Sequence, residues 1–166
     1  NTAESHPVIS YEVVRAVNSG ASLVVIDPRR VPMVDHATLW LQPAPGTDIY
    51  IFLAMAHVIL REGWADNAFI AARTEGFEAF AANLKEYTPE VAALHSGVPA
   101  DKIELAAYLY SLGRRAEDQA DGPADGRAGG EPLTRGNSTI LYAMGITQRS
   151  NGTELVLCLA NLALLC

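Results

Sequence analysis

The stretch "ASLVVIDPRR", residues 21–30, contains a short apolar run that ends on an acidic residue, a proline and two arginines. Its core, residues 23–26, is continuous and mostly β-branched, which is typical of a parallel strand buried on both faces. The preceding residues 8–20 have apolar side chains at helical spacing and end on a glycine that can cap a helix. A helix followed by a buried strand is half of an α/β repeat, so the stretch predicts an α/β fold.

The rest of the chain extends this pattern. A second strand is predicted at residues 37–42, "ATLWLQ", and a third at residues 138–146, "STILYAMGI". Residues 48–62 predict a central helix, because they are apolar on most sides. Further helices are expected at 67–74, from Pro89 onward, at about 99–112 and at 153–165.

Composition limits the classes of function. A chain of 166 residues with 49% hydrophobic and 19% charged residues is globular and long enough for one domain with a core. The net charge of −7 argues against nonspecific nucleic-acid binding, although local amides and arginines still suffice for a phosphate ligand. The longest apolar run, residues 155–166, is too short to cross a bilayer, so no membrane insertion is expected.

Two features affect the domain boundaries. Residues 113–136 are rich in glycine and nearly devoid of large apolar side chains, so we predict a disordered surface insertion within a single domain, 1–166. The chain begins with no element before its first helix and closes inside an apolar helix. We therefore expect a domain truncated at both ends, which self-associates through residues 155–166.

Three polar clusters, 27–30, 46–48 and 144–148, follow strands or precede a helix. In parallel α/β sheets, ligands bind at the carboxyl ends of strands. The Asp27 carboxylate could accept hydrogen bonds from a ribose diol or a guanine, while Gly46 would let a ligand approach the backbone. The alternative is that Asp27 only caps a turn and the arginines form surface ion pairs. The residue pattern leaves both interpretations open.

Motifs that would identify an active site are missing. The chain has no GxGxxG, GxxxxGK[ST], HExxH or GxSxG sequence, and its four histidines and two cysteines lack metal-ligand spacing. We interpret His57 as a hydrogen-bonded core histidine, because it lies on the apolar helix. His6 lies at the start of the first helix, close to Glu4. The sequence therefore predicts no catalytic residue and no metal ligand.

Several segments in order resemble the central region of the large subunit of molybdopterin oxidoreductases, and most closely that of formate dehydrogenase alpha subunits. The resemblance covers nearly the whole chain outside residues 113–136. "RTEGFE" with "YTPE" favours formate dehydrogenase over the nitrate reductases. The matching segments are "NTAESHPV", "VVIDPRR", "ATLWLQPAPGTD" with "MAHVILREG", "FIAARTEGFE", "YTPE", "SGVPADKI" and "YAMGITQ…GTE…LANLALL".

The resemblance implies a Rossmann-like, three-layer domain with a short parallel sheet flanked by helices. Such a domain would bind one of two molybdopterin guanine dinucleotides that hold molybdenum or tungsten. The guanosine end would lie at Asp27 and Arg29, and the phosphate or pterin portion near residues 144–148. The cofactor-binding residues that it implies are Asn1, Glu4, His6, Asp27, Arg29, Gly46, Asp48, Met144, Gly145, Thr147 and Gln148.

The resemblance also implies a parent enzyme that oxidises formate to carbon dioxide and passes electrons through the metal to iron–sulfur clusters. The family's cluster and metal ligands match nothing in this chain, so the fragment is expected to be inactive and without cofactor when isolated. Its expected partners are the other domains of the large subunit and electron-transfer subunits, in the cytoplasm. The alternatives are a nitrate reductase or other molybdopterin oxidoreductase, and a generic nucleotide-binding or interaction module without a redox role.

Overall fold

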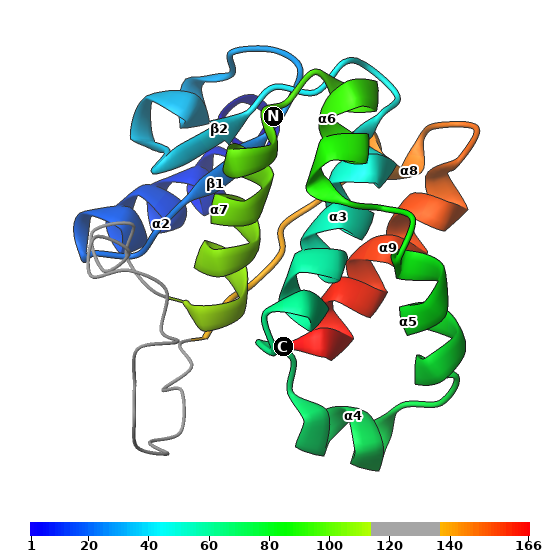
Figure 1. Ribbon diagram of the computed structural model, residues 1–166. Coiled ribbons are helices and arrows are strands. Elements are labelled where there is room, and N and C mark those ends of the chain that lie inside the picture. The colour runs from blue at the N-terminus through cyan, green and yellow to red at the C-terminus, as the bar shows by residue number, and fades with distance from the viewer. Residues whose placement is uncertain (114–136) are drawn as a thin grey trace.

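The computed structural model describes residues 1–113 and 137–166, and it is mostly helical with a short parallel sheet (Figure 1). Strand β1 (Val24–Ile26) pairs in parallel with β2 (Leu39–Leu41), and the 3₁₀ helix η1 (Pro32–His36) lies in the connection between them. The α-helices are α1 (Thr2–Ser5), α2 (Pro7–Asn18), α3 (Asp48–Arg61), α4 (Asn67–Arg73), α5 (Phe77–Leu84), α6 (Pro89–Ser96), α7 (Ala100–Leu112), α8 (Met144–Thr147) and α9 (Gly152–Leu165).

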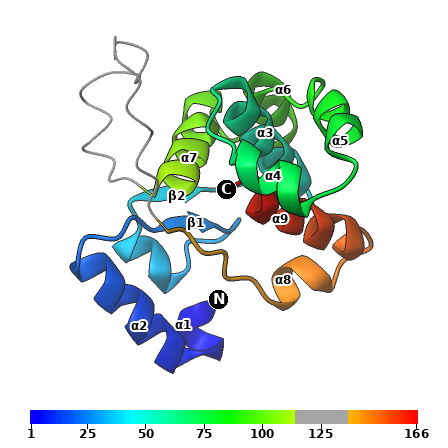
Figure 2. The same cartoon turned by 90° about the horizontal axis from the view of Figure 1, so that it is seen from below.

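The two-stranded sheet lies between two helical layers, as Figure 2 shows. Side chains alternate across the sheet, as expected for extended backbone. Val24, Ile26 and the β2 leucines belong to the main core with α3 and α7. Val25 and Trp40 face the opposite way, against a smaller cluster formed by η1 and α2. The predicted α/β arrangement, a short parallel sheet flanked by helices, is confirmed.

Helix α3 is the centre of the fold. Its side chains Ile51, Ala54, Val58 and Ile59 recur at helical spacing and are fully buried. The helix contacts α5, α6, α7 and α9. Because four helices pack around α3, the position of its N-terminus relative to the carboxyl ends of the strands is fixed. The prediction of a central buried helix is confirmed.

The helices after α3 begin where the sequence places their caps. The Asp66 carboxylate accepts a hydrogen bond from the Phe69 amide at 2.9 Å, and the Thr88 hydroxyl accepts one from the Val91 amide at 3.4 Å. The predicted closing helix is also present, as α9. It packs through one apolar stripe: Leu155, Leu159, Leu162 and Leu165.

Two predictions about strands are wrong. Residues 138–146 do not form a third strand, since 137–143 have no regular structure and α8 begins at Met144. In the described part of the chain only β1 and β2 pair, so this run adds no strand to the sheet, although its Ile140 packs in the same apolar cluster as Ile26 of β1. Strand β1 is also only half-buried, although each of its faces packs against an apolar cluster, so the expected full burial on both faces is not met. The N-terminal residues include the short helix α1.

The predicted insertion at 113–136 lies outside the described residues, except for Gly113, which ends α7 with a positive φ of 59°. Among the residues that are described, no helix combines the length and apolar character needed to span a membrane.

Candidate functional site

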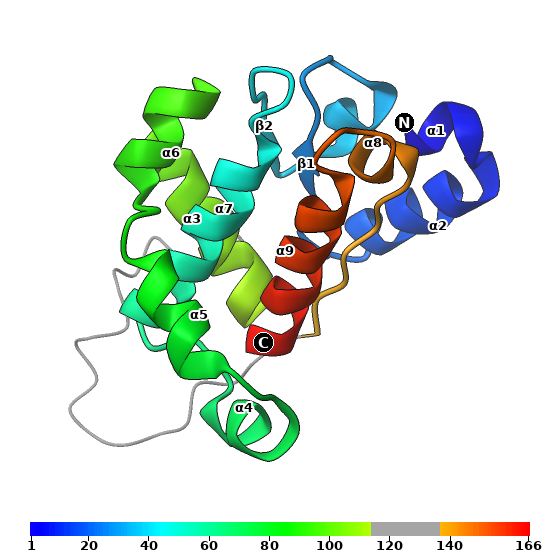
Figure 3. The same cartoon turned by 90° about the vertical axis from the view of Figure 1, so that its right-hand side faces the viewer.

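The structure brings the three predicted polar clusters to one end of the molecule (Figure 3). The connection after β1, the connection from β2 into α3, and α8 all lie at the upper end in this view, and α1 lies there too. The strands are parallel, so their carboxyl ends share one edge of the sheet. This edge is where ligands bind in α/β folds, and we refer to it as the candidate edge.

The turn after β1 is organised by Asp27. Its Oδ1 accepts a hydrogen bond from the Arg29 amide at 2.8 Å, and its backbone amide donates to the Leu41 carbonyl at 3.2 Å. The Trp40 indole donates to the Asp27 carbonyl at 3.0 Å. The interpretation of Asp27 as a turn cap is therefore confirmed for Oδ1. The Asp27 side chain is 21% exposed. Binding of a nucleoside by its second carboxylate oxygen, Oδ2, stays a prediction.

The two arginines of the turn differ in their surroundings. Arg30 donates to Asp35 at 2.5 Å and lies 6.0 Å from the centre of the Trp40 ring, so it forms the surface ion pair of the alternative interpretation. The Arg29 side chain is 74% exposed, with its Nε 3.9 Å from Asp27 Oδ1. Arg29 thus forms a long ion pair with Asp27 and is largely exposed to solvent. Sequence reasoning missed Gln42, whose amide donates to the Pro28 carbonyl at 3.0 Å and ties the end of β2 to this turn.

The connection into α3 contains an open turn at Gly46. Its φ of +92° belongs to the left-handed region that favours glycine, and nothing lies within 4 Å of the position of an added Cβ. Thr47 closes the turn, because its hydroxyl donates to the Ala44 carbonyl at 2.7 Å. The space beside Gly46 is therefore open, and the approach of a ligand to its backbone stays a prediction.

Asp48 differs from the other predicted residues because it is only 4% exposed. Its Oδ2 accepts a hydrogen bond from Nη1 of Arg149, and the two side chains form an ion pair. Sequence reasoning missed this pair, since its members lie 101 positions apart. The one available signal was chemical: a carboxylate that begins a buried helix requires a compensating charge.

Helix α8 and the residue after it are exposed on one side and packed against the core on the other. Met144, Gly145, Thr147 and Gln148 are exposed, with Met144 at 62%. Ile146 packs instead against a cluster formed by α3 and α9. These five residues, 144–148, are called the α8 segment below.

Gly152, at the start of α9, allows a close approach to the α8 segment. An added Cβ would lie 2.4 Å from the Thr147 carbonyl oxygen, which is closer than real Cβ atoms come. Sequence reasoning did not single out this glycine, although it follows an asparagine immediately before a helix.

The N-terminal residues of the predicted set are exposed at the same end of the molecule (Figure 3). Asn1 is the N-cap of α1, and His6 is the N-cap of α2 without a side-chain capping bond. Helix α1 contacts α2 and η1, and its Ala3 packs on the smaller apolar cluster. The segment that contains Asn1, Glu4 and His6 therefore lies on the face of the sheet that η1 and α2 cover.

Comparison with known proteins identifies the family. A sequence profile described as molybdopterin oxidoreductase matches residues 1–166. The chain belongs to the molybdopterin oxidoreductase family.

Three formate dehydrogenase chains are 34–38% identical to it over 99% of its length: the F420-dependent formate dehydrogenase subunit alpha of Methanocaldococcus jannaschii, at 36%, the F420-dependent formate dehydrogenase 1 subunit alpha of Methanococcus maripaludis, at 38%, and formate dehydrogenase H of Escherichia coli, at 34%. A nitrate reductase of Symbiobacterium thermophilum is 36% identical over 99% of the chain. Acetylene hydratase from Pelobacter acetylenicus shares the fold, with a TM-score of 0.77, 24% identity and coverage of 93% of this chain and 18% of its own. The chain spans about a fifth of the length of these formate and nitrate relatives.

Membership of the molybdopterin oxidoreductase family implies a pterin cofactor with molybdenum or tungsten. The candidate edge offers polar groups suited to such a cofactor: Arg29 is an exposed cation, open space lies beside Gly46, and Asp27 has a partly exposed carboxylate. The Asp48 carboxylate is buried against Arg149, and a contact of Asp48 with the cofactor stays a prediction. No group of three or more His, Cys, Asp or Glu side chains that could hold a metal ion occurs in residues 1–113 and 137–166.

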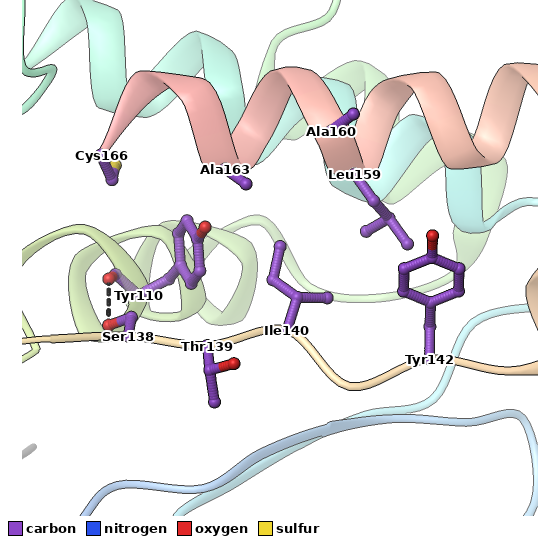
Figure 4. A pocket seen from close by; sticks show the side chains of 9 residues that line it. All are labelled: Tyr110, Ser138, Thr139, Ile140, Tyr142, Leu159, Ala160, Ala163 and Cys166. Atoms are coloured by element: carbon purple, nitrogen blue, oxygen red, sulfur yellow. Dashed lines mark hydrogen bonds between the residues drawn. The ribbon is translucent and has the colours of Figure 1, made fainter. Parts of the chain in front are cut away.

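Two features of the molybdopterin oxidoreductase chain lie apart from the candidate edge. His57 Nδ1 is 2.9 Å from the Leu84 carbonyl oxygen, so its interpretation as a hydrogen-bonded core histidine is confirmed. A pocket of about 340 Å³ lies between α7, α9 and residues 138–142 (Figure 4). Burial raises the pKa of Tyr110, in its wall, to about 12. The pocket contains no residue of the predicted cofactor-binding set; it is lined by Tyr110, Ser138, Thr139, Ile140, Tyr142, Leu159, Ala160, Ala163 and Cys166.

Proposed function

We propose that this chain binds the guanine dinucleotide end of a molybdopterin cofactor in a Rossmann-like manner, within a formate dehydrogenase. One observation carries the proposal: separate segments that carry exposed polar residues lie together at the carboxyl edge of a parallel sheet. The proposed contacts are the predicted residues of that edge, of which Asp48 is buried and Asp27 partly exposed: Asn1, Glu4, His6, Asp27, Arg29, Gly46, Asp48, Met144, Gly145, Thr147 and Gln148.

Each part of the candidate edge has its own task in this proposal. Asp27 Oδ2 accepts hydrogen bonds from the N1 and N2 donors of the guanine, while Oδ1 keeps the turn in place. The Arg29 guanidinium pairs with phosphate, for which its planar donors are suited. The open turn at Gly46 lets the backbone approach the same group. The polar groups of the α8 segment orient the remainder of the cofactor.

The cofactor, when bound, supplies two-electron redox chemistry at molybdenum or tungsten. We propose formate as the substrate, oxidised to carbon dioxide with release of a proton and two electrons that pass to iron–sulfur clusters and electron-transfer subunits. The formate dehydrogenase relatives support this substrate, and their "subunit alpha" names support further subunits. Because a nitrate reductase is among the relatives, nitrate is the second candidate substrate. A cytoplasmic location and self-association of the isolated chain stay predictions.

The experiment that tests the nucleotide assignment is calorimetric titration of the chain with GDP and ADP, for the wild type and Asp27→Asn. Asparagine retains an oxygen that can cap the turn but replaces the second acceptor by an NH₂ donor, which opposes guanine N1 and N2. We expect GDP to bind more tightly than ADP. Asp27→Asn should lower the ratio of the two affinities about tenfold, which is the contribution of one charge-assisted hydrogen bond.

The matched control is Asp35→Asn, which removes an exposed carboxylate from the neighbouring surface pair with Arg30. It should leave the preference for GDP unchanged. Equal affinities for GDP and ADP in the wild type would contradict the guanine assignment and support the generic nucleotide-binding module.

A further inference from the structure

We propose that Trp40 and Gln42 are positioning residues that hold the Asp27 turn, residues 27–30, in the conformation that binds a nucleotide. Both side chains act through backbone carbonyls of that turn. The nucleotide part of the inference rests on the function proposed above. The holding of the turn rests on the hydrogen bonds alone.

The two side chains reach the turn from the same face of β2. Trp40 lies within the strand and Gln42 directly follows it, two positions on, so their side chains point the same way. The Trp40 indole donates a hydrogen bond to the Asp27 carbonyl at 3.0 Å. The Gln42 side-chain amide donates to the next carbonyl, that of Pro28, also at 3.0 Å. One face of the neighbouring strand therefore holds two consecutive carbonyls of the turn.

These two bonds complete the pairing of the backbone in residues 27–29. The Asp27 amide donates to the Leu41 carbonyl at 3.2 Å, and the Arg29 carbonyl accepts from the Val31 amide at 2.9 Å. The Arg29 amide donates to Asp27 Oδ1 at 2.8 Å, and proline has no N–H group. Every backbone N–H and carbonyl of residues 27–29 thus has a partner within the protein. A nucleotide at this turn would meet the side chains of Asp27 and Arg29.

The bond from Gln42 acts on the carboxylate through one rigid peptide group. The Pro28 carbonyl and the Arg29 amide belong to the same planar peptide, so they turn together. Gln42 holds the carbonyl side of this peptide, and Asp27 Oδ1 accepts from its amide side. Rotation of the peptide would therefore break the capping bond and release the Asp27 carboxylate. The long ion pair of 3.9 Å between Arg29 Nε and the same Oδ1 depends on that orientation too.

Trp40 also contacts the second arginine of the turn. The Arg30 guanidinium lies 6.0 Å from the centre of the Trp40 ring and donates to Asp35 of η1 at 2.5 Å. These contacts hold Arg30 on the η1 side, whereas Arg29 lies beside Asp27. Trp40 is half-buried against the smaller apolar cluster, so it is a firm support for both contacts.

The test uses the full-length protein that carries this chain, produced without its cofactor so that GDP or ADP can be titrated. Gln42→Met keeps an unbranched side chain and removes the donor. Trp40→Phe keeps an aromatic ring beside Arg30 and removes the N–H donor. Thr38→Val is the matched control, because it breaks a side-chain bond at the opposite end of the strands, where the Thr38 hydroxyl accepts from the Leu23 amide at 3.1 Å.

Two readouts are measured: amide hydrogen exchange of residues 27–31, and the ratio of the affinities for GDP and ADP. With Gln42→Met and with Trp40→Phe we expect exchange in residues 27–31 to accelerate about tenfold while α3 stays protected, because the turn opens locally. The affinity ratio should fall at least about threefold, the lower end of the contribution of one hydrogen bond. Thr38→Val should change neither readout.

A double-variant cycle separates positioning from direct contact. If Gln42 acts through the Asp27 carboxylate, adding Gln42→Met to Asp27→Asn should lower the affinity ratio no further. Losses that add in the double variant would show that Gln42 contacts the guanine itself, and would overturn its positioning role.

Unchanged exchange in either variant would overturn the role of that residue in holding the turn. Faster exchange with an undiminished preference for GDP would overturn the nucleotide part. If Trp40→Phe does not fold, Gln42→Met decides, because the Gln42 side chain is exposed and its replacement leaves the core unchanged. Failure of the proposed function would appear as equal affinities for GDP and ADP in the wild type; the nucleotide part then falls with it, while the exchange results still decide the holding of the turn.

Discussion

Asp27 and Asp48 are both acidic residues at the carboxyl edge of the sheet, and the same reasoning from sequence assigned both to the cofactor. The structure satisfies them in different ways. Asp27 bonds to an amide two residues away and remains 21% exposed, whereas Asp48 is buried against an arginine 101 positions away. A carboxylate satisfied by its own turn retains an oxygen for a ligand. A carboxylate neutralised by a distant cation is suited to holding two segments together.

The largest expected effect comes from breaking the Asp48–Arg149 pair. Arg149→Met should lower the free energy of unfolding by about 3 kcal/mol, because it leaves a buried carboxylate uncompensated; Arg149 is partly exposed, so we expect the low end of the range for buried pairs. Urea denaturation measures this change. The double variant Asp48→Asn with Arg149→Met should lose clearly less than the sum of the single losses. Additive losses would show that the two side chains are not coupled.

The next effect concerns the backbone beside that pair. Gly152→Ala should cost about 2 kcal/mol, because the added Cβ would lie 2.4 Å from the Thr147 carbonyl oxygen and force α8 and α9 apart. Denaturation measures the loss. Gly145→Ala is the matched control on the same segment, since nothing lies within 4 Å of its added Cβ, and it should change stability far less. Equal losses from both variants would contradict the close approach.

The smallest effect is expected at the Asp27 turn. Asp27→Ala should cost about 1 kcal/mol, the contribution of one capping hydrogen bond, because alanine cannot accept from the Arg29 amide. Asp27→Asn should cost less, since its side-chain oxygen can still accept. Denaturation of both variants tests the order. A loss for Asp27→Ala as large as that for Arg149→Met would remove the contrast between the two carboxylates.

Much of the fold could be predicted because its signals are local. The apolar spacing of α3, the caps at Asp66 and Thr88, and the β-branched run of β1 each lie within one segment. The run at 138–146 has equally good strand residues, yet it forms no strand, because strand formation depends on a neighbour that the segment cannot specify.

The candidate site could be predicted only in part, for a related reason. Parallel strands bring their carboxyl ends together, so the positions of Asp27 and Gly46 follow from the order of elements. The Asp48–Arg149 pair and the approach of Gly152 to Thr147 join segments that meet only after the chain has folded. The sequence therefore indicated where polar groups gather, but not which of them would already be paired.

The most direct test of the division between the two carboxylates measures two readouts on two variants. Titration with GDP and ADP and exchange of residues 144–151 are compared for Asp27→Asn and Arg149→Met. We predict that Asp27→Asn reduces the preference for GDP without altering the exchange, and that Arg149→Met accelerates the exchange about tenfold or more. If Asp27→Asn retained the full preference for GDP, or accelerated the exchange as much as Arg149→Met does, the division would be contradicted.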